Sequence, residues 1–232
     1  MDGVTGEAPS ALARLGEMAQ LGGPVVGLLL AMAVVLLAVA ALKLVQFRAL
    51  RIESMAPVEA AVAAYRAGEP DAPARLDEAR NPAATVVAEA MRRHRAGADP
   101  ELAREEALTS AADHTENLRS HLRVLEIIAT LSPLLGLFGT VLGMIEAFQQ
   151  MEAAGNRVDP AVLSGGIWQA LLTTAVGLGV AIPATAVFTW LERRVERFAQ
   201  ATESALTRVF TAPLATRPVA EEAAHAPSQA VA

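Results

Sequence analysis

The chain has 232 residues, of which 53% are hydrophobic, and its formal net charge at pH 7 is −6. The apolar residues are clustered and more frequent than in ordinary soluble domains, which indicates a membrane protein. The absence of cysteine excludes a disulfide framework, thiolate catalysis and a cysteine-based metal site. Aromatic residues make up only 4% and no long basic run occurs, so we expect no nucleic-acid partner.

The first apolar segment, residues 22–42, contains no charged residue. A helix of about 20 apolar residues crosses a bilayer, so the segment predicts a transmembrane helix. A cleaved signal peptide is the alternative, and it requires a basic start and a shorter apolar core. Residues 1–21 carry three acidic residues and a single arginine, which favours a retained helix preceded by a segment outside the membrane.

Residues 43–123 are predicted to be a helical region, because alanine, arginine and glutamate are frequent and β-branched residues are few. Gly68 and Gly97 are each followed closely by a proline, which predicts two helix stops with a restart beyond each. We therefore expect several helices separated by short turns in this region.

The last helix of this region is expected to be long. Asp99 and Pro100 fit the N-cap and the first position of a helix. No strong breaker follows before Pro133. The sequence therefore predicts one uninterrupted helix from about Pro100, through the membrane, to about Met151.

Two more apolar segments predict transmembrane helices at residues 127–148 and 164–191, joined by a loop over 149–163. After the third span, apolar residues recur at helical spacing, which predicts that the helix continues over 192–212. Residues 213–232 are mostly small and polar residues with several prolines, so we expect a disordered tail.

Lysine and arginine gather at the same side of all three predicted spans, and the positive-inside rule assigns that side to the cytoplasm. These residues are Lys43, Arg48, Arg51, Arg119, Arg123, Arg193, Arg194 and Arg197. The opposite side carries only Arg14 and Arg157. The distribution predicts an N-terminus outside and a C-terminus in the cytoplasm, which makes residues 43–123 and 192–212 cytoplasmic.

Small residues recur at steps of three and four along the second and third spans, an arrangement that lets helices approach closely in lipid. In the second span they are Ser132, Gly136, Gly139, Thr140 and Gly143, and in the third they are Gly166, Ala170, Thr173, Gly177, Ala181 and Ala184. Each span also contains a proline, Pro133 or Pro183. We expect these residues to pack the two spans together as a hairpin.

Four uncharged polar side chains lie within the same two spans: Thr140, Gln169, Thr173 and Thr174. A threonine hydroxyl can bond to a carbonyl in its own helix, so a structural role of Thr173 and Thr174 is one interpretation. A glutamine amide does this less easily, which favours a polar lumen or a partner for Gln169. As a collar, the four side chains would hold water beside a partner's carboxylate and raise its pKa through poor solvation.

No ionisable residue lies in the middle of the second or third span, and Glu126 and Glu146 lie near the two ends of the second. A proton path through hydrocarbon normally uses an intramembrane carboxylate or histidine, so another chain has to supply the acid if ions cross. His114 and His121 are seven residues apart, which does not suit a metal pair. Without a P-loop or a nucleophile motif, we expect neither a cofactor nor an enzyme.

Two strings in these spans are specific. They read Pro-Leu-Leu-Gly-Leu-Phe-Gly-Thr-Val over 133–141 and Ala-Leu-Leu-Thr-Thr-Ala-Val-Gly-Leu-Gly-Val-Ala-Ile-Pro over 170–183. In both strings the chain resembles the MotA/TolQ/ExbB proton-channel family, and most closely its ExbB and TolQ branch, whose three-span layout it also shares. The resemblance covers about residues 100–200.

The resemblance implies an all-α integral protein of the bacterial inner membrane, with its N-terminus in the periplasm, that forms a homopentamer around a central pore. The second and third spans would line the pore, and long helices would extend into the cytoplasm. A single-span partner of the ExbD or TolR type would supply the pore aspartate, and a TonB- or TolA-like protein would receive the motion. The two pore threonines of the family fall on Thr140 and Thr174, whereas Gln169 stands where the ExbB pattern often has a glutamate.

Three functions remain open at this stage. The first is an ExbB-type stator subunit that energises TonB-dependent outer-membrane transport, and the second is a TolQ-type subunit for envelope maintenance. The third is a membrane scaffold that conducts no ions, which ion dependence would distinguish from the first two. The coupling ion is the proton in the family, and a neutral collar would also serve sodium.

Overall fold

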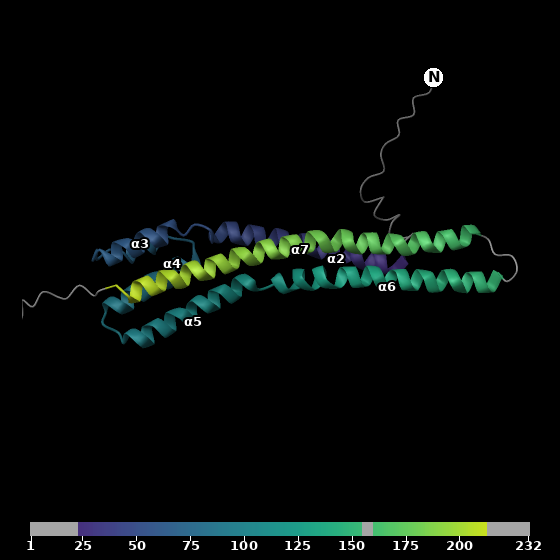
Figure 1. Cartoon of the computed structure of the whole chain (residues 1–232). Helices are drawn as coiled ribbons and strands as arrows, with labels where there is room; N and C mark the ends of the chain where they lie inside the picture. Colours follow the sequence, from purple (N-terminus) through teal and green to yellow (C-terminus); the bar gives the residue numbers. More distant parts are fainter. Residues whose placement is uncertain (1–22, 155–159, 213–232) are drawn as a thin grey trace, which may run out of the picture. The chain divides into compact units, whose positions relative to one another are not determined.

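The computed structural model describes residues 23–154 and 160–212, and within these ranges it contains helices and no strand. The helices are, in chain order, α2 (Gly23–Leu50), α3 (Ala56–Arg66), the short 3-10 helix η1 (Ala74–Leu76), α4 (Pro82–Arg95), α5 (Pro100–Arg119), α6 (Leu122–Ala154) and α7 (Pro160–Phe210) (Figure 1). The predicted all-α fold is confirmed. The predicted segments 1–21 and 213–232, and part of the loop 149–163, lie outside the described residues.

Three of the described helices, α2, α6 and α7, are long and apolar enough to cross a membrane, which confirms the three predicted spans. Many of their large apolar side chains are exposed in the single chain. Leu37, Trp168 and Ile182 are each more than 60% exposed, at 69%, 64% and 68%. Such surfaces are unfavourable in water, so lipid or other protein has to cover them.

The contacts within the chain divide it into two compact units. Of the described residues, the span unit contains 23–48, 117–154 and 160–196, and the stem unit contains 49–116 and 197–212. Helices α2, α5 and α7 each contribute residues to both units.

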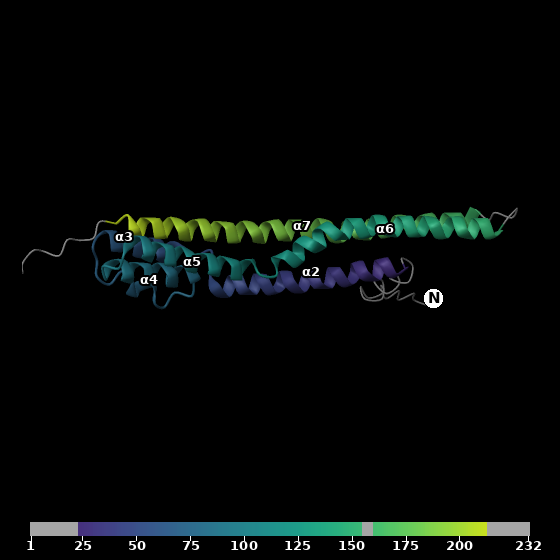
Figure 2. The ribbon, with the colours of Figure 1, turned by 90° about the horizontal axis from the view of Figure 1, so that it is seen from below.

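In the span unit, α6 and α7 run side by side, as Figures 1 and 2 show. Helix α2 buries one narrow stripe of its surface, which consists of Val26, Leu29, Leu36, Lys43 and Phe47. These residues are three, four or seven positions apart, so they share one helical face. Lysine is rarely fully buried, and Lys43 is the exception on this stripe.

The predicted uninterrupted helix from Pro100 to Met151 is wrong. Helix α5 ends at Arg119 and α6 begins at Leu122, and the two non-helical residues between them form a step between the helices. His121 has a φ of 65°, in the left-handed region, which costs a non-glycine residue about 1–2 kcal/mol. The sequence there contains neither glycine nor proline, so contacts from elsewhere in the fold have to hold the step.

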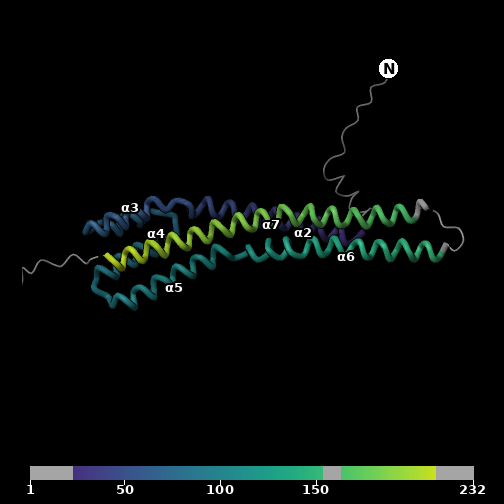
Figure 3. Tube along the Cα trace, in the orientation of Figure 1, coloured from purple at the N-terminus to yellow at the C-terminus, as the bar shows by residue number. Residues whose placement is uncertain are grey.

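In the stem unit, α3, η1 and α4 pack against one another (Figure 3). The stops predicted at Gly68 and Gly97 are confirmed, because both glycines have positive φ and follow the ends of α3 and α4. At Gly68 the amide donates to the carbonyl of Tyr65, as in a Schellman cap. At the start of α4, the Asn81 side chain accepts a hydrogen bond from the amide of Ala83 at 2.9 Å.

Candidate functional site

The contact between α6 and α7 is a seam of small residues that lets the two backbones approach closely. A Cβ added to Gly139 would lie 2.7 Å from Thr173 Cβ, and one added to Gly177 would lie 2.7 Å from the carbonyl oxygen of Ser132. The same seam joins Gly143 to Ala170 and Gly166 to Ala147. Because real Cβ atoms do not approach other atoms this closely, Gly139 and Gly177 cannot be enlarged without movement of the helices.

Two hydroxyls of α7 converge on one carbonyl of α6. The Oγ1 atoms of Thr173 and Thr174 lie 3.2 Å and 3.3 Å from the carbonyl oxygen of Gly136. Thr173 Oγ1 also lies 2.7 Å from the carbonyl oxygen of Ala170, and Thr173 is only 2% exposed. Thr173 is therefore enclosed in the seam, whereas the half-buried Thr174 lies at its edge.

Thr140 and Ser132 bond within α6 itself. The hydroxyl of the half-buried Thr140 donates to the carbonyl of Leu137 at 2.6 Å. The hydroxyl of the fully buried Ser132 donates to the carbonyl of Ile128 at 2.6 Å. Both hydroxyls are thus satisfied inside their own helix, and each still has an oxygen lone pair that can accept a hydrogen bond.

Gln169 lies in different surroundings from the three threonines. Its Nε2 would be 3.5 Å from a Cβ added to Gly23, so its amide lies beside the first residue of α2. The structure brings Thr173 and Thr174 together at Gly136, and it places Gln169 at the contact between α7 and α2.

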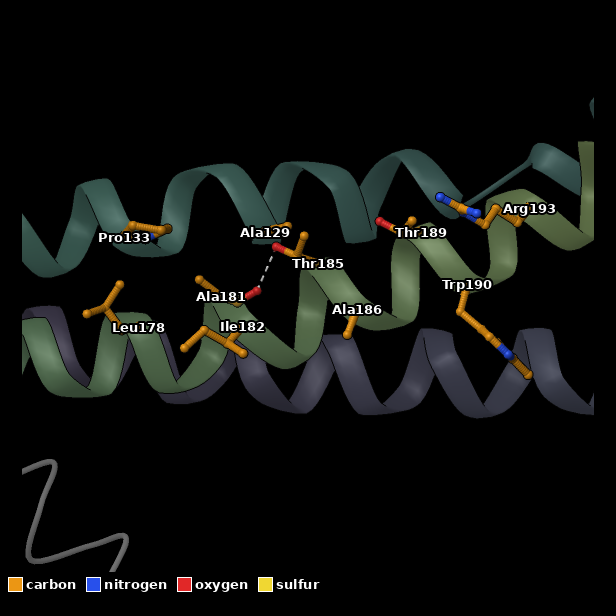
Figure 4. Close-up of a pocket in the computed structure, with 10 residues that line it drawn as sticks. All are labelled: Ala129, Pro133, Leu178, Ala181, Ile182, Thr185, Ala186, Thr189, Trp190 and Arg193. Atoms are coloured by element: carbon orange, nitrogen blue, oxygen red, sulfur yellow. Dashed lines mark hydrogen bonds between the residues drawn. The ribbon is translucent and has the colours of Figure 1, made fainter.

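Both predicted prolines lie inside their helices without ending them. Pro133 has no N–H, so the carbonyl of Ala129 lacks the helical donor it would otherwise have. Ala129 and Pro133 form the α6 side of a groove of about 720 Å³ (Figure 4). Pro183 is exposed on α7 and does not line this groove.

The α7 side of the groove carries polar residues that the sequence reasoning did not assign to a site. Thr185, Thr189 and Arg193 follow one another at four-residue steps, so they share one face of α7 (Figure 4). The hydroxyl of Thr185 donates to the carbonyl of Ala181 at 2.9 Å. Their four-residue spacing could have indicated a shared face in the sequence, but the three residues lie beyond the specific string at 170–183. Among residues 23–154 and 160–212, no three histidine, aspartate or glutamate side chains converge as metal ligands would.

The described chain thus has three helices long and apolar enough to cross a membrane, which is the layout of a multi-pass membrane protein, and threonine hydroxyls lie at the contact between α6 and α7. The family model that matches residues 78–204 is described as the MotA/TolQ/ExbB proton channel family. The match covers more than half of the chain and includes most of the hairpin, so the protein belongs to this family.

Three relatives indicate the extent of the similarity. The chain is 46% identical over 74 residues to the biopolymer transport protein exbB1 of Vibrio cholerae, which is 32% of each chain. It is 38% identical over 85 residues, 37% of each chain, to the Tol-Pal system protein TolQ of Haemophilus influenzae. It is 35% identical over 94 residues to the biopolymer transport protein ExbB of Pseudomonas putida, covering 40% of this chain and 28% of that one. The aligned stretches are therefore about a third of the relatives' length.

Proposed function

We propose that this chain is the wall subunit of a proton-driven stator in the bacterial inner membrane. Its α6–α7 hairpins would surround a central pore in a homopentamer, with the N-terminus in the periplasm and the C-terminus in the cytoplasm. The observation that carries the proposal is an uncharged hairpin with threonine hydroxyls, in a chain of a proton-channel family.

The lack of charge in the hairpin assigns the acid to a partner. No ionisable residue occurs from Ile127 to Ile145 or from Pro160 to Leu191. Proton passage through hydrocarbon needs a titrating group, so a single-span partner of the ExbD or TolR type supplies an aspartate. Thr140 and Thr174, both half-buried on the hairpin, are the residues that we expect to face that carboxylate.

The output of the stator is energised outer-membrane transport through a TonB-like protein. The relatives named as ExbB biopolymer transport proteins support this role. The second candidate is envelope maintenance through a TolA-like protein, which the match to a Tol-Pal system protein supports. A deletion strain separates the two roles, because loss of receptor-dependent uptake indicates the first and detergent sensitivity indicates the second.

The pore assignment is tested by replacing Thr174 with valine, which keeps the shape and removes the hydroxyl. We expect Thr174→Val to lower proton flux at least about tenfold in the complex co-purified with its single-span partner and reconstituted in liposomes, while assembly is retained. Thr130→Val is the matched control, because Thr130 is exposed on α6 and its hydroxyl bonds to the carbonyl of Glu126. Equal proton flux in wild type and Thr174→Val would exclude this assignment. A flux that depends on the sodium gradient instead of the proton gradient would identify sodium as the coupling ion.

A further inference from the structure

Lys43 is fully buried, although the sequence places it among the cytoplasmic flanking charges. A lysine ammonium has three N–H donors and needs a partner for each when it leaves water. The structure supplies three oxygen acceptors. Lys43 Nζ lies 2.9 Å from Gln46 Oε1, 3.1 Å from the carbonyl oxygen of Leu118 and 3.4 Å from Ser120 Oγ.

Two of these acceptors belong to the step between α5 and α6. Leu118 lies in the last turn of α5, where carbonyls have no partner inside the helix. Ser120 follows the end of α5, and its hydroxyl donates to the carbonyl of Asn117 at 2.7 Å. Lys43 thus satisfies one carbonyl of the α5 terminus directly and holds the serine that satisfies another.

The contact with Leu118 engages a carbonyl that would have a different donor in an uninterrupted helix. In such a helix the carbonyl of Leu118 would accept a hydrogen bond from the amide of Leu122, four residues later. In the structure α5 ends at Arg119, and Lys43 Nζ donates to the Leu118 carbonyl oxygen. His121 is a non-glycine residue in the left-handed region, and its sequence neighbours contain no glycine or proline, so the contacts of Lys43 with Leu118 and Ser120 are the interactions that hold the step.

We propose that Lys43 is a positioning residue that holds the step between α5 and α6 open and thereby fixes where α6 starts. Thr140 lies on α6, so its placement in the pore depends on Lys43. This role rests on the proposed function, because the position of α6 affects proton flux only if α6 lines the pore.

The first test measures the step itself. Hydrogen exchange of the backbone amides of residues 121–123 is followed in the full-length complex in lipid nanodiscs. In Lys43→Met these amides gain helical acceptors, and we expect their exchange to slow about tenfold or more. Arg48→Met is the matched control, because Arg48 is an exposed cation on the same helix. Unchanged or faster exchange in Lys43→Met overturns the proposal. If the Lys43→Met variant does not assemble, the same measurement is made on Lys43→Gln.

The second test separates positioning from simple stability. We expect Lys43→Met to lower proton flux about tenfold, and a second substitution, His121→Gly, to restore it, because glycine adopts the left-handed conformation without a Cβ penalty. Slowed exchange with normal flux, or the absence of rescue, overturns the positioning role while leaving the pore assignment intact. Normal flux in Thr174→Val overturns the pore assignment and leaves the exchange result standing.

Discussion

Gly177 and Gly179 lie two residues apart on α7, and only Gly179 has space around it for a larger side chain. A Cβ at Gly177 would be 2.7 Å from the carbonyl oxygen of Ser132 and 3.0 Å from the Cα of Gly136, whereas a Cβ at Gly179 would meet no atom within 4 Å. We expect Gly177→Ala to destabilise the hairpin by about 1–3 kcal/mol, since the backbones have to separate.

Gly179→Ala is the matched control for this prediction. In the isolated chain it should be neutral or stabilising, because alanine favours a helix over glycine by up to about 1 kcal/mol. The midpoint of thermal unfolding of the purified chain in detergent measures both variants. Equal midpoints for Gly177→Ala and Gly179→Ala would contradict the close approach of α6 and α7.

Lys43 illustrates what residue-level reasoning can and cannot obtain from the sequence. The sequence assigns Lys43 to the basic side of the first span by composition alone. Its burial depends on acceptors that lie 75 residues further along the chain, at Leu118. No local pattern predicts such a pairing, so the sequence analysis also missed the step between α5 and α6 that the pairing holds.

At the scale of elements, His94 joins three helices of the stem unit. Its Nδ1 lies 2.8 Å from the hydroxyl oxygen of Tyr65 on α3, and its ring meets Phe210 of α7 edge-on at 5.6 Å between centroids. Burial lowers the pKa of His94 below its usual value, and the charged group near this cluster, Arg95 over the Tyr65 ring, is also a cation. The neutral imidazole can accept the Tyr65 O–H, and a proton on Nδ1 would reverse that bond.

The lowered pKa of His94 predicts acid sensitivity of the stem unit. Above about pH 6.5 both the folded and the unfolded states hold a neutral imidazole, and the contribution to stability is complete. As the pH falls below that value, the unfolded state binds a proton first, so the free energy of unfolding decreases by up to about 1.4 kcal/mol per pH unit until the folded state titrates. Thermal unfolding of the full-length chain between pH 7.5 and 5.5 measures this decrease.

His94→Asn provides the comparison for the acid sensitivity. Asparagine keeps an oxygen acceptor near the position of Nδ1 and does not titrate, so its pH dependence over the same interval should be smaller. His114→Asn, a change at a half-buried histidine of α5, should leave the dependence of the wild type in place. A dependence that persists unchanged in His94→Asn would assign the effect to other groups.

Elements were predictable from the sequence to the extent that local patterns determine them. Apolar length predicts three spans, and glycine with a following proline predicts the ends of α3 and α4. The seam between α6 and α7 follows from the three- and four-residue spacing of small residues. The place of Gln169 beside Gly23 does not follow from any local spacing, because it depends on how α2 packs against α7.

At the scale of the whole molecule, the charge distribution predicts a membrane topology that cysteine labelling can test. The flanks that are predicted to be cytoplasmic carry eight lysines and arginines, from Lys43 to Arg197, and the opposite side carries two, Arg14 and Arg157. Positive residues close to spans are retained in the cytoplasm, so this asymmetry predicts the connection between α6 and α7 on the periplasmic side.

The natural chain contains no cysteine, so single cysteines report the topology directly. Glu152→Cys, an exposed position at the end of α6, should react with a membrane-impermeant maleimide in cells whose outer membrane alone has been made permeable. Glu203→Cys, an exposed position near the end of α7, should react only after the inner membrane is also opened. Glu78→Cys, exposed between η1 and α4, should behave like Glu203→Cys, because both positions are predicted to be cytoplasmic. Labelling of Glu203→Cys before the inner membrane is opened would invert the topology. Residues 43–123 and 192–212 would then lie in the periplasm, which contradicts the cytoplasmic side that the basic flanks predict.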